Sequence, residues 1–481
     1  MPVISPARKA AFQILMAVER GHSHSDDLLR GKAVNILSAQ DRNLATTLVL
    51  GVLRWQIRLD HQLQSLLKRP NAKLDPEILI ALRLGAFQLQ HLDRIPARAA
   101  IDESVELAKQ AGHRFASGMV NAVLRKIAVS APPQERSFAL KGHGFSHDRE
   151  VEQEDRALAP EGMLVELSAA DSALSEAHPT WMVERWAGFY GIEAARGICR
   201  HGQTQPALKV RLASADAEEE LTREGIQLAP GELLTAARTV VSGDVTATAA
   251  FREGRILLQD EGSQLVAEIA GQQSTGPMQS ILDCCAAPGG KTLILAERNP
   301  QARIVACESS AQRLTQLRSR LAAHAGRIEC RLADATALTE DEEFDLALAD
   351  VPCSGTGTLG RNPEIRHRLR LEDLPRQVER QRAILTAALR AVRVGGRVIY
   401  STCSLEPEEN EQVVAALPAE GAKARLVSLE SRIESLRDEA ILTSSAATRL
   451  RNCLTPEGAL RLLPGVFHTD GFFIAMIERT A

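Results

Sequence analysis

Two cysteines are the residues whose type and surroundings point most clearly to chemistry. Cys353 lies in 350–354 (DVPCS) and Cys403 in 401–404 (STCS), each directly after a short apolar run. A structural cysteine normally lies in mid-strand among apolar neighbours, whereas these two lie among small polar residues. Two buried structural thiols are the plainer alternative. Reactive thiols here suit methylation of a pyrimidine ring carbon, which is not nucleophilic until a thiolate adds to the neighbouring ring carbon.

A loop of small residues, 283–292 (DCCAAPGGKT), follows another apolar run and precedes a helical stretch. Its glycines allow the backbone to pass close to a ligand, and the N-terminus of the next helix favours a negative group such as a carboxylate. The end of the loop resembles a phosphate-binding loop, but that pattern requires glycine where Cys285 stands. The loop therefore predicts a ligand site for which ATP is a poor candidate.

Two acidic residues follow the next two apolar runs. Glu308 stands 25 residues after Asp283, and an acidic residue at about this separation commonly holds ribose hydroxyls in Rossmann-type units. Asp334 follows the third run, where it can meet an adenine edge. Either residue alone would be an exposed loop carboxylate in most proteins. Together with the glycine loop, they predict an adenosine-bearing ligand that is not a nucleoside triphosphate.

The elements that position these residues alternate between apolar, β-rich runs and helical stretches. The runs are 281–282, 303–307, 328–332, 344–349, 397–400 and 472–477. Such alternation predicts a doubly wound α/β sheet, in which ligands bind at the carboxyl ends of the strands. Both cysteines, the glycine loop and the two acids are therefore expected at one edge of the sheet.

The first 130 residues have a different pattern. Apolar residues recur at spacings of three and four, which predicts an all-helical bundle. This segment contains 18 Lys and Arg against 11 Asp and Glu, although the whole chain carries a net charge of −4. The excess predicts a phosphate-binding domain, with a chance asymmetry of a solvated surface as the alternative. The candidate phosphate contacts are Lys9, Arg42, Arg54 and Arg58.

Four segments are expected along the 481 residues, since one hydrophobic core seldom serves a chain of this length. Residues 1–130 form the helical, phosphate-binding domain, and 131–172 form an acidic, partly flexible linker. Residues 173–255 mix helix, short strands and turns in a small α+β module. Residues 256–481 form the catalytic domain.

Composition argues against several classes of protein. No run of about 18 residues is apolar throughout, and the N-terminus lacks the apolar core and cleavage site of a signal peptide. Eight cysteines are too sparse for a disulfide scaffold. The adjacent Cys284 and Cys285 lack the spacing of a zinc site, and His143 and His147 have no further ligand nearby. We therefore expect a cytoplasmic protein with reduced thiols, no metal and no membrane segment.

These motifs resemble the RNA cytosine-5 methyltransferase superfamily, whose members carry Pro-Cys and Thr-Cys motifs, here Pro352-Cys353 and Thr402-Cys403. The 283–291 loop closely matches the first motif of that superfamily. With a helical head similar to a NusB-type RNA-binding domain, most of the chain resembles the bacterial 16S rRNA cytosine-5 methyltransferase B family (RsmB/Fmu). Other segments that resemble family blocks are 259–263 (QDEGS) and 470–473 (DGFF), and 430–450 reads as an insert.

The resemblance implies a Rossmann-like class I methyltransferase domain with a mostly parallel seven-stranded sheet, an all-α NusB-like domain and a small α+β linking module. It implies S-adenosylmethionine as the cofactor and RNA as the partner, namely 16S rRNA, free or in an early assembly particle. The implied reaction is methyl transfer to carbon 5 of a specific cytidine through a covalent cysteine-cytosine intermediate. A monomer is the default expectation.

The resemblance also assigns roles to single residues. Cys403 would add to carbon 6 of the cytosine, Cys353 would help to remove the proton from carbon 5, and Asp350 would hydrogen-bond the target ring at nitrogen 3 from a place between cofactor and base. Glu308 would bind the ribose and Asp334 the adenine. The other cofactor contacts would come from the glycine loop: Cys285, Ala286, Ala287, Pro288, Gly289, Gly290 and Lys291.

Three positions depart from the family pattern. Glu308 replaces the usual Asp, which shifts the ribose contact without losing the carboxylate. Val351 replaces the usual Ala and crowds its loop slightly. Ala213 stands where an Arg-x-Asn pattern that begins at Arg211 would have its Asn, so an RNA contact in this segment is an open question.

Three other functions fit part of the pattern. A tRNA substrate fits the catalytic motifs equally well, since only the helical head favours rRNA. A non-catalytic RNA-binding or ribosome-assembly factor fits the helical head alone. DNA cytosine methylation fits the Pro-Cys motif but does not account for Thr402-Cys403, because the DNA enzymes use the Pro-Cys cysteine as their nucleophile.

Overall fold

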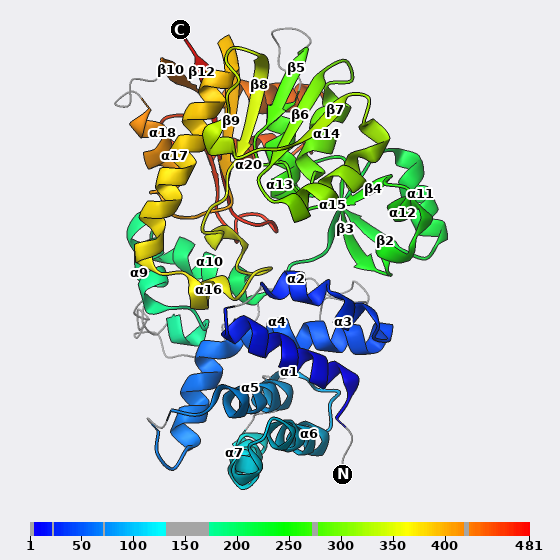
Figure 1. The fold of residues 1–481 in the computed structure, drawn as a ribbon, viewed down its shortest axis with the longest axis vertical. Coiled ribbons are helices and arrows are strands. Elements are labelled where there is room, and N and C mark those ends of the chain that lie inside the picture. Colours follow the sequence, from blue (N-terminus) through cyan, green and yellow to red (C-terminus); the bar gives the residue numbers. More distant parts are fainter. Residues whose placement is uncertain (1–3, 22–23, 71–72, 131–172, 272–277, 418–422) are drawn as a thin grey trace, which may run out of the picture. The chain divides into compact units, whose positions relative to one another are not determined.

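A computed structural model describes residues 4–21, 24–70, 73–130, 173–271, 278–417 and 423–481. The chain forms two compact units (Figure 1). The first contains Met1–Gln205 and Leu359–Arg368, and the second contains Pro206–Thr358 and Leu369–Ala481. The expected linker 131–172, with His143 and His147, lies outside the described residues.

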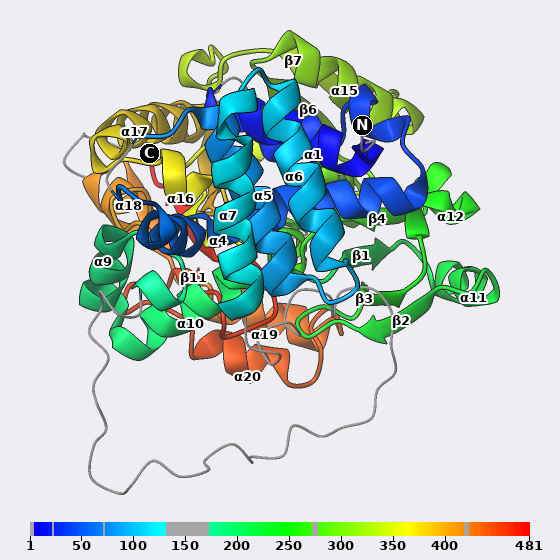
Figure 2. The same cartoon turned by 90° about the horizontal axis from the view of Figure 1, so that it is seen from below.

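The first unit is built on five long helices, α1 (Pro6–Glu19), α4 (Ala39–Leu66), α5 (Pro76–His91), α6 (Ala97–Gln110) and α7 (Ser117–Ser130). Figure 2 shows α5, α6 and α7 side by side. Leu48, Leu82 and Leu124 are fully buried in this bundle. Gly51 allows α4 and α5 to approach closely, because a β-carbon there would lie 2.0 Å from the ring of Phe87. The apolar periodicity thus forms the all-helical bundle that the sequence predicts.

Shorter helices complete this unit: α2 (Ser25–Leu29), α3 (Lys32–Asn35), η1 (Arg114–Ala116), α9 (Thr180–Tyr190), α10 (Ile192–Gln203) and α16 (Ile365–Arg368). In α16, the buried Arg366 donates to the carbonyls of Ala177 at 3.1 Å and Gly202 at 3.0 Å. Glu364, also buried, accepts hydrogen bonds from the backbone N and the hydroxyl of Ser25, both at 2.9 Å. These contacts fix the segment that carries α16 within the helical unit.

The segment 173–255, expected as one module, is divided between the two units. Helices α9 and α10 belong to the first unit, where Gln203 donates to the carbonyl of Arg54 at 3.0 Å. The strands belong to the second unit and form an antiparallel sheet in the order β2-β3-β1-β4. These strands are β1 (Lys209–Leu212), β2 (Gln227–Pro230), β3 (Ala237–Ser242) and β4 (Ile256–Leu258), accompanied by α11 (Ala215–Arg223), η3 (Val245–Ala247) and α12 (Ala249–Arg252).

The main sheet of the second unit has the strand order β10-β12-β9-β8-β5-β6-β7, with β11 paired to β12. Its strands are β5 (Ser280–Asp283), β6 (Arg303–Glu308), β7 (Ile328–Leu332), β8 (Phe344–Asp350), β9 (Val392–Thr402), β10 (Ala424–Val427), β11 (Leu460–Leu462) and β12 (Phe472–Arg479). The strands from β9 to β7 are parallel, whereas β12 pairs antiparallel with β9. This path is the mostly parallel, seven-stranded sheet that we expected, and β11 adds a short strand beside it.

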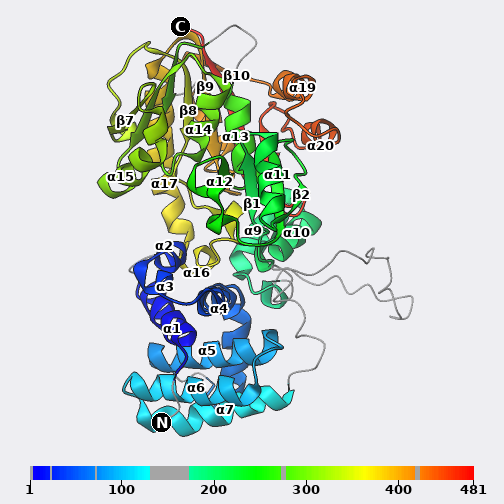
Figure 3. The same ribbon diagram turned by 90° about the vertical axis from the view of Figure 1, so that its right-hand side faces the viewer.

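Helices cover both faces of the main sheet (Figure 3). One core contains side chains of α13 (Glu261–Ala270), α14 (Gly290–Arg298), α15 (Ala311–Leu321), α19 (Glu430–Asp438) and α20 (Ala446–Arg451). The other contains side chains of α17 (Leu374–Ala391) and α18 (Glu411–Ala416). Successive strand residues point to opposite faces, so Ile281 enters the first core and Leu282 the second. The remaining short 3-10 helices of this unit are η4 (Ala322–His324), η5 (Ala335–Ala337), η6 (Thr356–Thr358) and η7 (Leu371–Asp373).

Each of the six apolar runs lies in a strand, which confirms the doubly wound α/β sheet predicted from them and the Rossmann-like fold class that the resemblance implies. The short strands β10 and β11 were not predicted from the sequence. The segment read as an insert, 430–450, forms α19 and most of α20, and both pack on the main sheet. Among the described residues, no helix is both long and apolar enough to span a membrane.

Candidate active site

The carboxyl ends of the parallel strands bring the expected site residues to one edge of the main sheet. Strand β5 ends at Asp283, β6 at Glu308 and β8 at Asp350. Cys403 directly follows β9, and Asp334 stands two residues after β7. Because these five strands are neighbours and run parallel, their carboxyl ends meet at the same edge.

The glycine loop joins β5 to α14 and has little room for side chains. Gly289, with φ of 98°, precedes the first residue of α14, and a β-carbon there would lie 2.9 Å from Leu317. At Gly290 a β-carbon would lie 3.0 Å from Oε1 of Gln259. The left-handed backbone of Gly289 and the close packing of Gly290 both favour glycine. The loop can therefore follow the floor of a ligand site closely.

A cavity opens beside this loop, within the second unit. Of the expected cofactor residues, seven line it: Cys285, Ala286, Ala287, Pro288, Gly290, Lys291 and Asp350. Five more lining residues were not among the expected cofactor contacts: Leu258, Gln259, Ser263, Asp283 and Arg320. Gln259 and Ser263 come from the block 259–263, whose resemblance to the family pattern was the available signal for them.

Three expected cofactor residues, Gly289, Glu308 and Asp334, are absent from the described lining of this cavity. The buried carboxylate of Glu308 accepts a hydrogen bond from the N of Ser310 at 2.8 Å. The exposed carboxylate of Asp334 accepts one from the N of Thr336 at 3.0 Å, which caps η5 and lowers the pKa of Asp334. Both acids thus have local partners, and their contacts to ribose and adenine stay predictions.

Lys291 and Asp350 form an ion pair at the cavity wall. Their Nζ and Oδ2 atoms are 2.8 Å apart, and the hydroxyl of Ser401 donates to the other carboxylate oxygen at 2.7 Å. Burial alone would lower the pKa of Lys291, but the negative charge of Asp350 outweighs it, so the pKa is raised. Lys291 is therefore a cation that holds Asp350 in a defined orientation.

Asp283 is a second carboxylate of the cavity, and its partners are incomplete. Its Oδ2 accepts a hydrogen bond from the hydroxyl of Thr292 at 2.7 Å, while Oδ1 is buried with no hydrogen-bond partner among the described residues. Burial raises the pKa of Asp283 to about 7, and the nearby charge of Asp350 adds to this effect. A buried oxygen without a partner at a cavity suits a ligand that carries a positive charge or a donor.

The two expected catalytic thiols are in contact. The Sγ atoms of Cys353 and Cys403 are 3.4 Å apart, and both side chains are partly buried. The hydrogen bond with Cys403, followed by burial, raises the pKa of Cys353 well above its ordinary value. The two thiols are therefore close enough to form a hydrogen bond with each other.

Sequence reasoning missed Glu409, which binds the two serines that directly follow Cys353 and Cys403. This glutamate is fully buried and accepts hydrogen bonds from the N of Ser354 at 2.9 Å and from the hydroxyl of Ser404. Gln381 of α17 donates to Glu409 and to the carbonyl of Pro352, each at 2.9 Å. The available signal was the acidic run 406–409 (EPEE), which closely follows a reactive cysteine.

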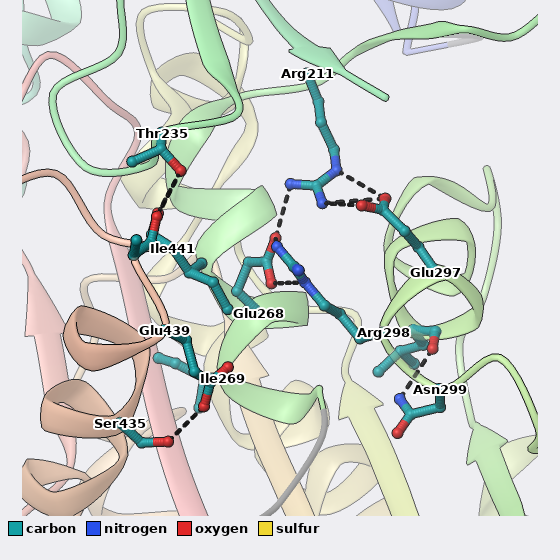
Figure 4. Close-up of polar contacts among 12 residues, drawn as sticks. Arg211, Thr235, Glu268, Ile269, Glu297, Arg298, Asn299, Ser435, Glu439 and Ile441 are labelled. Carbon is teal, nitrogen blue, oxygen red and sulfur yellow. Dashed lines mark hydrogen bonds and ion pairs between the residues drawn. The ribbon is translucent and has the colours of Figure 1, made fainter. Parts of the chain in front are cut away.

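Two arginines considered as RNA contacts are buried instead. Arg211 pairs with Glu268 at 2.7 Å and with Glu297 at 2.9 Å, and only 1% of its side chain is exposed (Figure 4). Arg54 donates to the carbonyl of Gly360 at 2.7 Å, and burial lowers its pKa to about 10. Both side chains stabilise the fold through these contacts, and neither guanidinium is exposed to solvent.

Two family models match this chain. Residues 274–478 match the family model described as "16S rRNA methyltransferase RsmB/F", and residues 5–129 match the NusB family model. The expected NusB-like head is thereby confirmed.

Relatives match along nearly the whole chain. A protein of Bacillus subtilis described as "Probable ribosomal RNA small subunit methyltransferase B" is 33% identical and covers 98% of both chains. "Ribosomal RNA small subunit methyltransferase B" of Pseudomonas putida is 32% identical over 88% of this chain and 91% of its own. A solved methyltransferase homolog protein from Pyrococcus horikoshii is 25% identical, with a TM-score of 0.52 over 67% of this chain and 100% of that one.

Proposed function

The chain belongs to the 16S rRNA methyltransferase RsmB/F family, and we propose that it transfers a methyl group from S-adenosylmethionine to carbon 5 of a cytidine in 16S rRNA. The observation that carries this proposal is the contact between Cys353 and Cys403 at the ends of neighbouring strands, 3.4 Å from sulfur to sulfur. The printed names of the relatives support an rRNA substrate. The thiol chemistry suits a pyrimidine ring carbon, and the choice of carbon 5 of cytosine comes from the resemblance to the RNA cytosine-5 methyltransferase superfamily.

The cavity beside the glycine loop fits such a cofactor. Close packing at Gly289 and Gly290 leaves the backbone as the floor of the site. The unpartnered oxygen of Asp283 could receive a positively charged amino group, and the helix N-terminus at Gly290 suits a carboxylate. Cys285, Ala286, Ala287, Pro288 and Lys291 would complete the wall, with Glu308 and Asp334 toward the ribose and the adenine. When bound, the cofactor supplies an electrophilic methyl group.

Cys403 begins the reaction in this proposal. Its thiolate forms a bond to carbon 6 of the cytosine, and the electron pair of the ring double bond becomes available at carbon 5. Carbon 5 can then accept the methyl group.

Cys353 and Asp350 complete the cycle. Cys353 helps to remove the proton from carbon 5, after which the bond between carbon 6 and Cys403 breaks and the double bond returns. Nitrogen 3 gains negative charge as the adduct forms and takes up a proton from water, and its N–H then donates a hydrogen bond to the carboxylate of Asp350. The proton is released when the adduct breaks down. The ion pair of Asp350 with Lys291 and its bond from Ser401 hold the carboxylate ready for this contact.

The helical unit would hold the RNA while this chemistry takes place. A paired base cannot reach the thiols, so the target cytidine is in a loop or is flipped out. Lys9 and Arg42 are exposed and can meet phosphates, which lengthens residence without specifying sequence. All eight cysteines are free thiols, as a reducing compartment such as the cytoplasm requires.

The direct test is transfer of labelled methyl groups from S-adenosylmethionine to unmodified 16S rRNA and, separately, to tRNA. We expect 5-methylcytosine at one position of 16S rRNA and no label in tRNA. Label confined to tRNA would overturn the choice of substrate, and label on a base other than cytosine would overturn the chemistry. Failure to bind S-adenosylmethionine in calorimetry would favour a non-catalytic RNA-binding factor.

A further inference from the structure

One buried carboxylate with no assigned part in the reaction connects the two loops that carry the thiols. One oxygen of Glu409 accepts hydrogen bonds from the N of Ser354 and from Nε2 of Gln381, each at 2.9 Å. Its other oxygen accepts from the hydroxyls of Ser354 and Ser404. The two serines directly follow the two cysteines in the sequence. A single side chain therefore holds both loops.

The acceptor capacity of this carboxylate matches its surroundings. An ionised carboxylate has two oxygens with about four lone-pair sites, and four donor groups point at Glu409. An amide would offer one oxygen, and an apolar side chain would offer none. Because burying a carboxylate is costly even when it is hydrogen-bonded, a neutral residue would serve better if filling space were the only task at this position.

Neighbouring hydrogen bonds make the arrangement stiff. The N of Gly357 donates to the carbonyl of Cys403 at 2.9 Å, which joins the two loops through their backbones. Asn410 accepts from the hydroxyl of Thr402 at 2.5 Å and donates to the carbonyl of Ser404 at 2.9 Å. The loop after β9 is thus held on both sides of its cysteine.

We propose that Glu409 is a positioning residue that keeps the thiols of Cys353 and Cys403 in contact by binding Ser354 and Ser404. The expected effect of Glu409 on methyl transfer rests on the proposed function, whereas its effect on the contact between the two thiols does not.

The test measures how fast the two thiols join in the full-length protein without RNA or cofactor. Diamide takes up two electrons and two protons as the Cys353–Cys403 disulfide forms, and peptide mapping by mass spectrometry follows this product. We expect Glu409→Ala to form it about tenfold more slowly than the wild type, with Glu409→Gln in between, because small displacements sharply lower the rate of such a reaction. Methyl transfer by Glu409→Ala should lose about 100-fold in kcat with unchanged KM.

A matched control separates positioning from the general cost of altering a buried glutamate. Glu261 belongs to the same unit, is 1% exposed, and accepts hydrogen bonds from the backbone N of Leu233 at 2.6 Å and Leu234 at 2.7 Å. Glu261→Gln should leave the rate of disulfide formation unchanged. Should Glu409→Ala not fold, the double variant Ser354→Ala with Ser404→Ala removes both hydroxyl donors, keeps the carboxylate, and should also slow the reaction.

The outcomes distinguish the two proposals. If Glu409→Ala folds and joins its thiols as fast as the wild type, the positioning role is wrong, even if the wild type methylates 16S rRNA. If the variants slow disulfide formation in the predicted order while the wild type methylates no RNA, the positioning role stands and the proposed function fails. Equal slowing by Glu261→Gln would also overturn the positioning role, because the effect would then be a general one.

Discussion

Glu268 and Glu409 are both fully buried in the second unit, and their surroundings differ in charge. Glu268 pairs with Arg211 at 2.7 Å and with Arg298 at 2.6 Å, so its charge is neutralised within the scaffold (Figure 4). The four hydrogen bonds to Glu409 come from uncharged donors. A buried carboxylate paired with arginines joins elements of the scaffold, whereas Glu409, bound by neutral donors, joins the two loops that carry the thiols.

The largest effect is expected on stability, when Glu268 is altered. Glu268→Gln removes the buried anion that Arg211, which is buried, shares with Arg298, which is partly exposed. We expect the free energy of unfolding in urea to fall by about 3–5 kcal/mol. Methyl transfer per folded molecule should not change. The control is Glu297→Gln, which removes a partner of Arg211 that is 44% exposed, and it should cost about 1 kcal/mol or less. Equal losses in the two variants would contradict the scaffold role of Glu268.

A pH-dependent effect of nearly the same size is expected at Asp283. The pKa of Asp283 in the folded protein is about 7, above the ordinary value of about 3.9 for an unfolded chain. The folded state therefore holds this proton more tightly, and the stability that this group contributes falls as the pH rises from 4 to 7. Asp283→Asn should lack this fall, so its stability relative to the wild type should rise by on the order of 4 kcal/mol between pH 4 and pH 8.

Asp334 provides the matched control for that measurement. Its hydrogen bonds from Thr336 lower the pKa of Asp334, so the stability that it contributes is present at neutral pH and is lost as the pH falls. Asp334→Asn should therefore change the pH dependence in the opposite direction. Urea unfolding at several pH values checks both variants, and the same direction in both would show that the environments are misassigned.

The next effect is on catalysis and concerns the ion pair at the cavity wall. Asp350→Asn removes the partner of Lys291 and the carboxylate assigned to the target ring. We expect kcat/KM for methyl transfer to fall by about 100-fold, as when a single preorganised hydrogen-bonding group is removed from an active site. Ser401→Ala, which removes only one hydrogen bond to Asp350, should cost about fivefold. A fully active Asp350→Asn enzyme would exclude this role.

The smallest effect is expected on RNA binding and concerns two arginines of the helical unit, one exposed and one buried. Arg42 is exposed, whereas Arg54 is buried and bound to the Gly360 carbonyl. Arg42→Ala should weaken rRNA binding a few-fold and lower the dependence of log affinity on log salt by about 0.7–0.9, with stability unchanged. Arg54→Ala should lower stability instead. Filter binding at several salt concentrations tests this, and an unchanged salt slope for Arg42→Ala would remove that residue from the RNA contacts.

Much of the fold could be predicted from local sequence. The runs that became β5 to β9 and β12 are apolar and bounded by turns, so periodicity identified them. The division of 173–255 could not be predicted in this way. Helices α9 and α10 belong to the helical unit through contacts such as that of Gln203 with Arg54, which are far apart in sequence.

The candidate site was predictable to a similar degree. Strand ends followed by cysteines, acids or glycines indicated which residues share one edge of the sheet. The sequence could not indicate that Glu409 binds both thiol loops, because its donors come from three separate segments. It also could not distinguish the buried Arg211 from an arginine that faces RNA, since that depends on Glu268 and Glu297.

In the proposed reaction Cys403 is the nucleophile and Cys353 serves release of the product. The most direct test of these roles compares wild type, Cys403→Ala and Cys353→Ala with labelled S-adenosylmethionine and unmodified 16S rRNA, with denaturing gels to detect protein joined to RNA. We predict that Cys403→Ala transfers no methyl groups and forms no adduct, while Cys353→Ala accumulates a covalent adduct. Wild-type activity in Cys403→Ala, or an adduct that requires Cys353, would contradict the account.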